Sequence, residues 1–461
     1  MAGADTIKCV GPSYFLADRK SAVQRSVNLY MRQVEGLGED KQVVLDSAPG
    51  LSLLVTMPAT VRNSYNADGR WFVVAGSMLY ELGASGTYGY RGTLVTTTGF
   101  ASMKHGRDQL VIVDGANGYV LNLNTNNFGQ IISPGWRGSN WVDELDGYSI
   151  FSDPNTDQFY LSSIDDASTL NALDFSSADA QPDNIVTCRV RRRELHLFGT
   201  RSTEIWVNSG DADFPFIRYN STPIDVGIVG NRAAAVCTDS IVWVGQTDRG
   251  QGYVYEMQGH QPVRISTQAV EEALDGSTDL SQASVWSYHV KGNEFAAINA
   301  PGLSTTWVYD FSVRQWHERA ELVSGAWAPF RGDFCTFNGG NHYVSSGAKI
   351  YHMDTQFHTL AGDPLVRERT WPHFVKPSRE PVAYRGLELA CTSGEGGNIT
   401  LELSNDGGFT WGPPLRRSLG AVGRFMQRIR WLMLGAAFDR VFRLRCSDNV
   451  NLTIHAGVVD V

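Results

Sequence analysis

The chain has 461 residues, and a single hydrophobic core stops growing at about 250–300 residues, so we expect two or three domains. Hydrophobic residues make up 42% and charged residues 19% of the sequence, which excludes a disordered polyelectrolyte. The formal net charge of −9 argues against a dedicated nucleic-acid-binding protein, because such proteins usually carry an excess of basic residues.

Neither a membrane-spanning segment nor a signal peptide is expected. The best apolar run, residues 431–438, is far shorter than the roughly 18 residues that a spanning helix needs. The first residues, Met1–Asp5, lack the basic flank and apolar stretch of a signal peptide. Since the six cysteines form no Cys-x-x-Cys pair, we expect buried thiols in a protein that folds where it is made.

Hairpins dominate the first three quarters of the chain. Each has two short strands rich in β-branched and aromatic residues around a turn of Gly, Asp, Asn or Pro, which adopt the dihedral angles that turns require. In chain order they occupy residues 70–82, 110–123, 148–161, 195–207, 241–257, 294–311 and 342–353. One such module every ~40–50 residues is typical of a β-propeller with a four-stranded blade per repeat.

Seven hairpins favour seven blades, and six is the alternative if one hairpin belongs to an inserted segment. A row of separate sandwiches is the other arrangement that such hairpins allow. We predict the propeller over residues 61–376, preceded by an N-terminal segment, residues 1–60, that partly closes it and contacts neighbouring subunits. Residues 266–274, with Val270, Ala273 and Leu274 on one face, predict a short connecting helix.

From about residue 377 the pattern changes to strict alternation of apolar and polar residues, as in Leu387–Cys391 and Phe442–Cys446. Four or more such runs are typical of an antiparallel sheet with one dry face. The sequence therefore predicts a small C-terminal antiparallel β-sandwich over residues 377–461, after a proline-containing linker at Lys376–Pro381. From residue 370 onward the chain has 11 basic and 8 acidic side chains, whereas the rest is strongly acidic.

One segment of the sandwich fits the pattern S-x-D-x-G-x-T-W of the Asp-box turns of sialidases. Its pattern residues are Ser404, Asp406, Gly408, Thr410 and Trp411. The acidic and hydroxyl side chains are expected to accept bonds from nearby amides while the glycine takes a positive φ and the tryptophan packs beneath, so the role is structural. A propeller glycosidase stays an alternative that would need two carboxylates in one pocket.

Other candidate sites fail on their spacing. Asp153, Asn155 and Asp157 begin like a calcium loop, but Gln158 occupies the position of the required glycine. The histidines near residue 350 fit no zinc motif, and no phosphate-binding loop or nucleophile elbow is present. We therefore expect no catalytic residue, no metal and no cofactor.

Two arginine clusters remain. Arg189, Arg191 and Arg193 have the period of a strand, which would place all three on one face. The second cluster lies in the C-terminal domain and consists of Arg424, Arg428, Arg430, Arg440, Arg443 and Arg445. Such clusters could contact acidic partner surfaces or a nucleic-acid backbone, and a solvated or internally paired face is the alternative.

An ordered set of short motifs covers nearly the whole chain. They are residues 26–30 (SVNLY), 48–51 (APGL), 102–106 (SMKHG), 181–185 (QPDNI), 198–206 (FGTRSTEIW), 210–216 and the C-terminal stretch through 430–431, 434–435, 439–442 and 447–448. In this set and order the chain resembles the packaged-DNA stabilisation or tail-hub (nozzle) proteins of short-tailed bacteriophages.

The resemblance implies a structural protein of the virion tail, made in the host cytoplasm, and not an enzyme. It implies a ring, with six subunits, below the portal and its adaptor ring, which extends the DNA channel and helps retain the packaged genome. The implied partners are other copies of the chain, the adaptor, a tail needle or plug, tailspikes or fibres, and DNA in transit.

On this reading, Arg189, Arg191 and Arg193 are candidates for the channel wall, and the C-terminal arginines are candidates for contacts with the adaptor or between subunits. Arg443 and Arg445 would be the first to test by charge reversal. A free-standing propeller that acts as a binding module is the remaining alternative.

Overall fold

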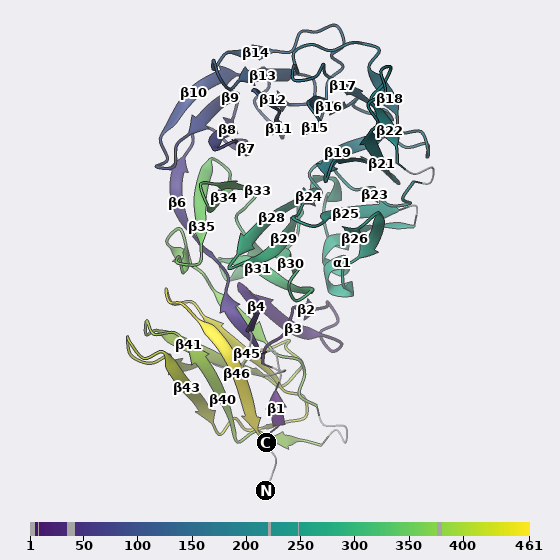
Figure 1. Ribbon diagram of the computed structural model, residues 1–461. Helices are drawn as coiled ribbons and strands as arrows, with labels where there is room; N and C mark the ends of the chain where they lie inside the picture. Colours follow the sequence, from purple (N-terminus) through teal and green to yellow (C-terminus); the bar gives the residue numbers. More distant parts are fainter. Residues whose placement is uncertain (1–4, 8, 35–41, 220–222, 248, 376–379) are drawn as a thin grey trace.

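The computed structural model describes residues 5–7, 9–34, 42–219, 223–247, 249–375 and 380–461. Figure 1 shows a ring of small antiparallel sheets above a second β-rich body, with the C-terminus at the foot of the latter. The prediction of an all-β fold is therefore confirmed. The described α-helix, α1 (Gln268–Asp275), lies where the sequence predicts a connector.

The first four sheets of the ring follow one another along the chain, and each has four antiparallel strands. The first contains β7 (Val61–Ala67), β8 (Arg70–Ala75), β9 (Met78–Leu82) and β10 (Tyr88–Thr93). The second contains β11 (Ser102–His105), β12 (Gln109–Val113), β13 (Gly118–Asn122) and β14 (Phe128–Gln130). The third contains β15 (Val142–Leu145), β16 (Tyr148–Ser152), β17 (Gln158–Leu161) and β18 (Phe175–Ser177). The fourth contains β19 (Ile185–Arg191), β20 (Glu194–Gly199), β21 (Thr203–Asn208) and β22 (Phe216–Arg218).

Three more groups complete the ring. The fifth has β23 (Gly227–Ile228), β24 (Ala234–Val236), β25 (Ile241–Thr247), β26 (Gly250–Gln258) and β27 (Gln261–Arg264). The sixth has β28 (Ser284–Val290), β29 (Asn293–Asn299), β30 (Thr306–Asp310) and β31 (Gln315–Val323). The last has β33 (Phe334–Asn338), β34 (Asn341–Ser346), β35 (Lys349–Asp354) and, from the N-terminal segment, β6 (Gly50–Thr56).

One strand of each group faces the centre of the ring. These strands, β7, β11, β15, β19, β24, β28 and β33, each contact the next, and β33 contacts β7. This circle is the arrangement of a β-propeller. The blade count stays a prediction, because the pairing joins the sixth and last groups to strands outside the circle.

Two sheets form the sandwich, and both recruit strands from the N-terminal segment. One has β4 (Leu29–Val34), β5 (Gln42–Ser47), β46 (Thr453–Asp460), β40 (Gly386–Thr392) and β43 (Met426–Leu432), with β1 (Asp5–Ile7) on β46. The other has β3 (Val23–Val27), β38 (Arg367–Thr370), β45 (Val441–Cys446), β41 (Asn398–Ser404) and β42 (Leu415–Ser418). The predicted boundary at residues 376 and 377 lies outside the described residues.

Strand β3 connects the two bodies. It pairs in parallel with β31 of the sixth propeller group and antiparallel with β38 of the sandwich. One sheet of 11 strands therefore continues from the propeller into the sandwich. The remaining short elements are β2 (Tyr14–Phe15), β32 (Ala326–Pro329), β36 (Thr359–Leu360), β37 (Asp363–Pro364), β39 (Val382–Ala383), β44 (Ala436–Ala437) and a 3₁₀ turn, Leu280–Gln282.

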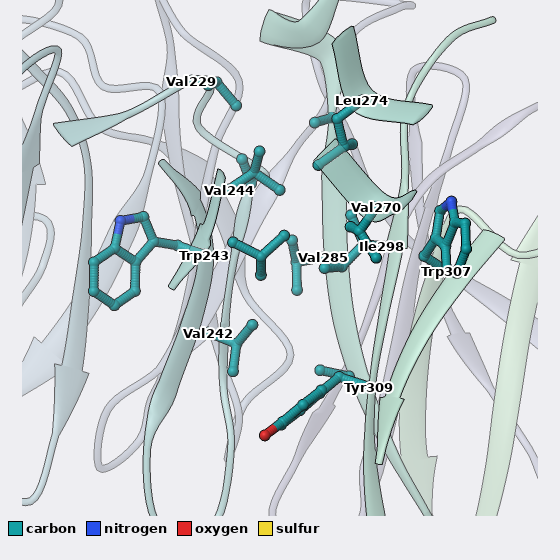
Figure 2. Packing of buried hydrophobic residues seen from close by; sticks show 14 of the residues in the cluster. Val229, Val242, Trp243, Val244, Val270, Leu274, Val285, Ile298, Trp307 and Tyr309 are labelled. Atoms are coloured by element: carbon teal, nitrogen blue, oxygen red, sulfur yellow. The ribbon is translucent and has the colours of Figure 1, made fainter. Parts of the chain in front are cut away.

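The largest core cluster lies between the fifth and sixth groups. Figure 2 shows Val244 of β25 and Val285 of β28 close to Val270 and Leu274 of α1. The two α1 residues are four positions apart, so they share one helix face, and both are buried. Packing of this face explains why so short a helix persists, since an isolated helix of this length is marginal in water.

Candidate functional site

The three arginines around β19 do not share one environment. Arg189 is buried, 3% exposed, and donates hydrogen bonds to the carbonyl oxygens of Asn231 (2.8 Å) and Ala234 (3.0 Å). Its Cζ lies 3.5 Å from the centre of the Trp141 ring. Burial lowers the pKa of Arg189 to about 10. This side chain is a structural cation inside the propeller.

Arg193 lies beyond the strand, so the expectation of one shared face is wrong for it. β19 ends at Arg191, which pairs with Glu194, and Arg192 and Arg193 form the two-residue turn with φ of 50° and 63°. A two-residue turn with two positive φ values suits the twist of a hairpin. Arg193 is exposed and forms an ion pair with Asp146 at 2.8 Å, and Arg191 is half-buried.

Three of the six C-terminal arginines are engaged by other groups of the sandwich. Arg440 is buried, with its Cζ 4.7 Å from the Tyr384 ring centre, and it donates to the Leu434 carbonyl oxygen. Arg443 pairs with Glu402 at 2.6 Å, and its Cζ lies 3.8 Å from the ring centre of Trp411. Arg445 pairs with the buried Glu368 at 2.8 Å.

The other three lie on an exposed edge of the sandwich. Arg428 and Arg430 both pair with Glu388, at 2.5 and 2.6 Å, so one carboxylate balances two guanidinium groups. Arg424 lies in the exposed loop before β43. Two residues that sequence reasoning missed, Arg416 and Arg417 of β42, are also exposed, and Arg417 Nε donates to the Arg430 carbonyl oxygen at 3.1 Å. The sequence feature that could have identified these two residues is the Arg-Arg pair itself, which places two adjacent positive charges in one short strand.

We name this surface the basic edge and define it as Arg416, Arg417, Arg424, Arg428 and Arg430. Exposed apolar side chains accompany it: Val422 is 82%, Phe425 63% and Met426 69% exposed. Residues 377–461 contain ten arginines and no lysine. Arginine, methionine and aromatic residues are enriched in protein interfaces while lysine is depleted, so the composition of the edge is that of a contact surface.

The Asp-box segment forms a turn that its own side chains hold. Asp406 accepts hydrogen bonds from the Thr410 hydroxyl (2.5 Å) and from the backbone N–H groups of Phe409 (3.0 Å) and Thr410 (2.9 Å). These hydrogen bonds hold the pKa of Asp406 well below its ordinary value, and the bond from the Thr410 hydroxyl has the largest effect. The Ser404 hydroxyl accepts from the Gly408 N–H at 2.8 Å.

The same turn abuts the N-terminal segment. A Cβ on Gly408, where φ is 88°, would lie 2.7 Å from Val23 Cγ2, so glycine is needed for this contact. Arg19 donates to the Gly408 carbonyl oxygen at 2.8 Å. The arrangement joins two distant segments of the chain, which is a structural role.

Within the described ranges, no three His, Cys, Asp or Glu side chains are grouped so that they could hold a metal ion. None of the helices in the described part of the chain has the length and apolar character that a bilayer crossing requires.

Comparisons with known proteins give a consistent result for both bodies. A family model described as bacteriophage P22 Gp10, beta-propeller, matches residues 23–358, and one described as bacteriophage P22 Gp10, beta-sandwich, matches residues 368–461. The predicted order of propeller and sandwich is therefore confirmed. No curated protein matches the sequence.

Solved structures similar to the chain include domains of two other proteins. The N-terminal domain of Nup159 aligns at 8% identity with a TM-score of 0.42, over 71% of this chain and 99% of that one. The WD40 β-propeller domain of Doa1 aligns at 10% identity with a TM-score of 0.42, over 66% of this chain and 96% of that one.

Proposed function

Because the chain belongs to the family of bacteriophage P22 Gp10, as models of both its domains match in order, we propose that it forms the hub of a short phage tail. At the coarse level the chain is a structural protein of the phage tail. In the proposed role, copies of it form a ring below the portal and its adaptor, extend the DNA channel, help retain packaged DNA and attach the distal tail parts.

The basic edge is the surface that supports assembly. It combines five exposed arginines with exposed apolar side chains, on a chain whose net charge is −9. A basic surface on an acidic molecule suits head-to-tail contacts that close a ring, because each copy can present unlike surfaces to its two neighbours. A needle or plug and tailspikes or fibres remain proposed partners at other surfaces.

Contact with DNA is proposed to be transient. The acidic net charge favours passage of DNA over tight binding of DNA to the channel wall, since affinity for DNA rises steeply with each phosphate contact. Of the three arginines near β19, Arg193 is the exposed candidate for a channel wall, while Arg189 is enclosed by protein.

The family is structural, and the propeller glycosidase receives no support from the comparisons. Quantitative mass spectrometry of purified particles tests the proposal, with about six copies per virion expected for a single closed ring. Absence of the chain from particles, or monomers that persist beside purified adaptor, would favour a free-standing binding module instead.

A further inference from the structure

The loop that joins β42 to β43, residues 419–425, carries apolar side chains into solvent. Val422 is 82% and Phe425 63% exposed. The backbone of the loop is held at one point, where the Gly423 N–H donates to the Gly394 carbonyl oxygen at 2.8 Å. Apolar groups on a loop whose backbone is already fixed lose less conformational freedom on binding, so this loop suits a contact with a second molecule.

A cavity of about 440 Å³, which we name the turn cavity, lies beside the Asp-box turn. Its lining includes Leu403, Asp406, Trp411, Gly412, Leu434 and Arg440. The next residue to Leu434, Met433, is 91% exposed, so apolar surface continues outside the cavity. Pockets that receive an apolar or aromatic anchor are typical centres of protein interfaces. The turn cavity therefore offers a receptor for side chains of the kind that the loop carries.

Arg440 retains unused donors at the turn cavity. It is 2% exposed and makes one hydrogen bond among the described residues, from Nη1 to the Leu434 carbonyl oxygen at 2.8 Å. Its Nε has no acceptor in the described part of the protein. Asp406, in contrast, is an exposed carboxylate that the bonds of its own turn keep ionised. The cavity can thus receive a carbonyl oxygen beside Arg440 and a positive charge near Asp406.

The loop and the turn cavity lie at opposite ends of the sandwich strands. The first residue of β41, Asn398, pairs with Ser418, which directly precedes the loop, and its last residue, Ser404, lies two positions before Asp406 of the cavity. Seven residues of strand span about 20 Å. A loop at one end of β41 cannot fill a cavity at the other end, so a contact between the two surfaces joins different copies.

We propose that loop 419–425 of one copy inserts into the turn cavity of the next and joins their sandwiches head to tail. The apolar side chains of the loop contact the apolar lining, a loop carbonyl oxygen accepts from Arg440, and the Arg424 guanidinium lies near Asp406. Contacts between unlike surfaces close into a ring when the rotation between copies allows it. The inference rests on the proposed function and names the partner of the basic edge, which is a second copy of this chain.

Cross-linking in purified particles tests the contact. Val422→Cys and Gly412→Cys in one chain place a thiol on the loop and one in the cavity, where a Cβ on Gly412 has no neighbour closer than 3.5 Å. The native cysteines are buried or partly buried, so their background reaction is low. With a short bismaleimide we expect a ladder of covalent multimers from the double variant and monomers from each single variant, because unlike positions meet in the contact.

The control pair is Val422→Cys with Gly129→Cys, since Gly129 is a propeller glycine with open space around its Cβ position. This pair should stay monomeric under the same reagent. All cysteine variants must unfold at the wild-type temperature, so that a missing cross-link reports the contact and not the fold.

Two blocking variants give a second readout. Val422→Asp alters the loop and Gly412→Arg fills the cavity, and each should reduce the copies per particle at least about tenfold, as for loss of an interface anchor. A mixture of the two purified chains retains one intact contact and should form dimers and nothing larger by native mass spectrometry. Val95→Asp, at a position that is 68% exposed, and Gly129→Arg are the matched controls and should be incorporated normally.

The outcomes separate this contact from the tail-hub role. Particles with the wild-type copy number but without a cross-link between residues 412 and 422 would overturn the contact and leave the role intact. Particles that lack the chain would overturn the role and the contact with it. Multimers from Val422→Cys alone would show a two-fold contact, and a cross-link to another virion protein would show a different occupant, and either result overturns the inference.

Discussion

Some arginines of this protein are engaged by rings and carboxylates of the fold, and others face solvent. Arginines close together in the sequence can belong to either kind. Arg440 and Arg443 pack against aromatic rings and Arg445 pairs with a buried carboxylate, whereas Arg428 and Arg430 face solvent. A buried guanidinium is stable only where carbonyl oxygens, carboxylates or rings replace its hydration. Charge reversal at Arg443 and Arg445 would therefore place acidic groups against Glu402 and Glu368 and disturb folding before assembly.

At the turn of Ser404–Trp411, Asp406→Asn should make stability less sensitive to acid. The bonds to Asp406 depress its folded pKa, so its stabilising contribution is complete above the unfolded value of about 3.9 and is lost as the pH falls through the folded value. The difference in urea midpoint between wild type and variant should be constant from about pH 5 to 7 and shrink below about pH 4. A difference that grows toward acid would contradict this.

Among the elements, β3 links the two bodies, because it pairs with β31 of the propeller and with β38 of the sandwich. Asn28 follows it in the left-handed region, at φ 53°, and is fully buried. Its amide donates to the carbonyl oxygens of Ala320 (2.7 Å) and Val366 (2.8 Å) and accepts from the Ala320 N–H (3.1 Å). The family motif at residues 26–30 is therefore the joint between propeller and sandwich.

Asn28→Ala should lower the free energy of unfolding by about 2–4 kcal/mol, because it leaves several buried backbone groups unpaired and places alanine at a positive φ. Chemical denaturation followed by tryptophan fluorescence measures the change. Asn124→Ala, at an exposed position, is the control and should change stability by less than about 0.5 kcal/mol. Equal effects of the two substitutions would refute the role of Asn28 as a joint.

Strand β6 completes the last propeller group from the opposite end of the chain. A Cβ on Gly50, its first residue, would lie 2.2 Å from the Phe357 carbonyl oxygen, and backbone cannot yield as a flexible side chain can. Gly50→Ala should therefore cost about 2–4 kcal/mol and expose the last group to proteolysis. Gly129→Ala, with open space around its Cβ position, should leave the cleavage rate unchanged.

At the scale of the whole molecule, the continuous sheet through β3 makes propeller and sandwich one connected body, so contacts made by the basic edge also position the propeller. Charge reversal at Arg424 and Arg416 should reduce incorporation into tails at least about tenfold, since like charges at an interface cost several kcal/mol. Copies per particle, measured by mass spectrometry, report the effect.

The control for that experiment is Arg107→Glu, an exposed arginine of the propeller that is 73% exposed. Both variant proteins must unfold at the wild-type temperature, so that a loss of incorporation reports assembly. Wild-type copy numbers in the Arg416 and Arg424 variant would show that the basic edge is not an assembly surface.

The sequence by itself determined the local elements, because alternation of period two, turn residues and a four-residue helical spacing act between near neighbours. Residues 70–82, for example, form β8 and β9 where the hairpin was predicted. Tertiary structure alone decided that β6 completes the last group, that β4 and β5 join the sandwich, and that Arg189 is buried while Arg193 is exposed. Pairing between distant segments and the enclosure of a charge depend on groups that only the folded chain brings together.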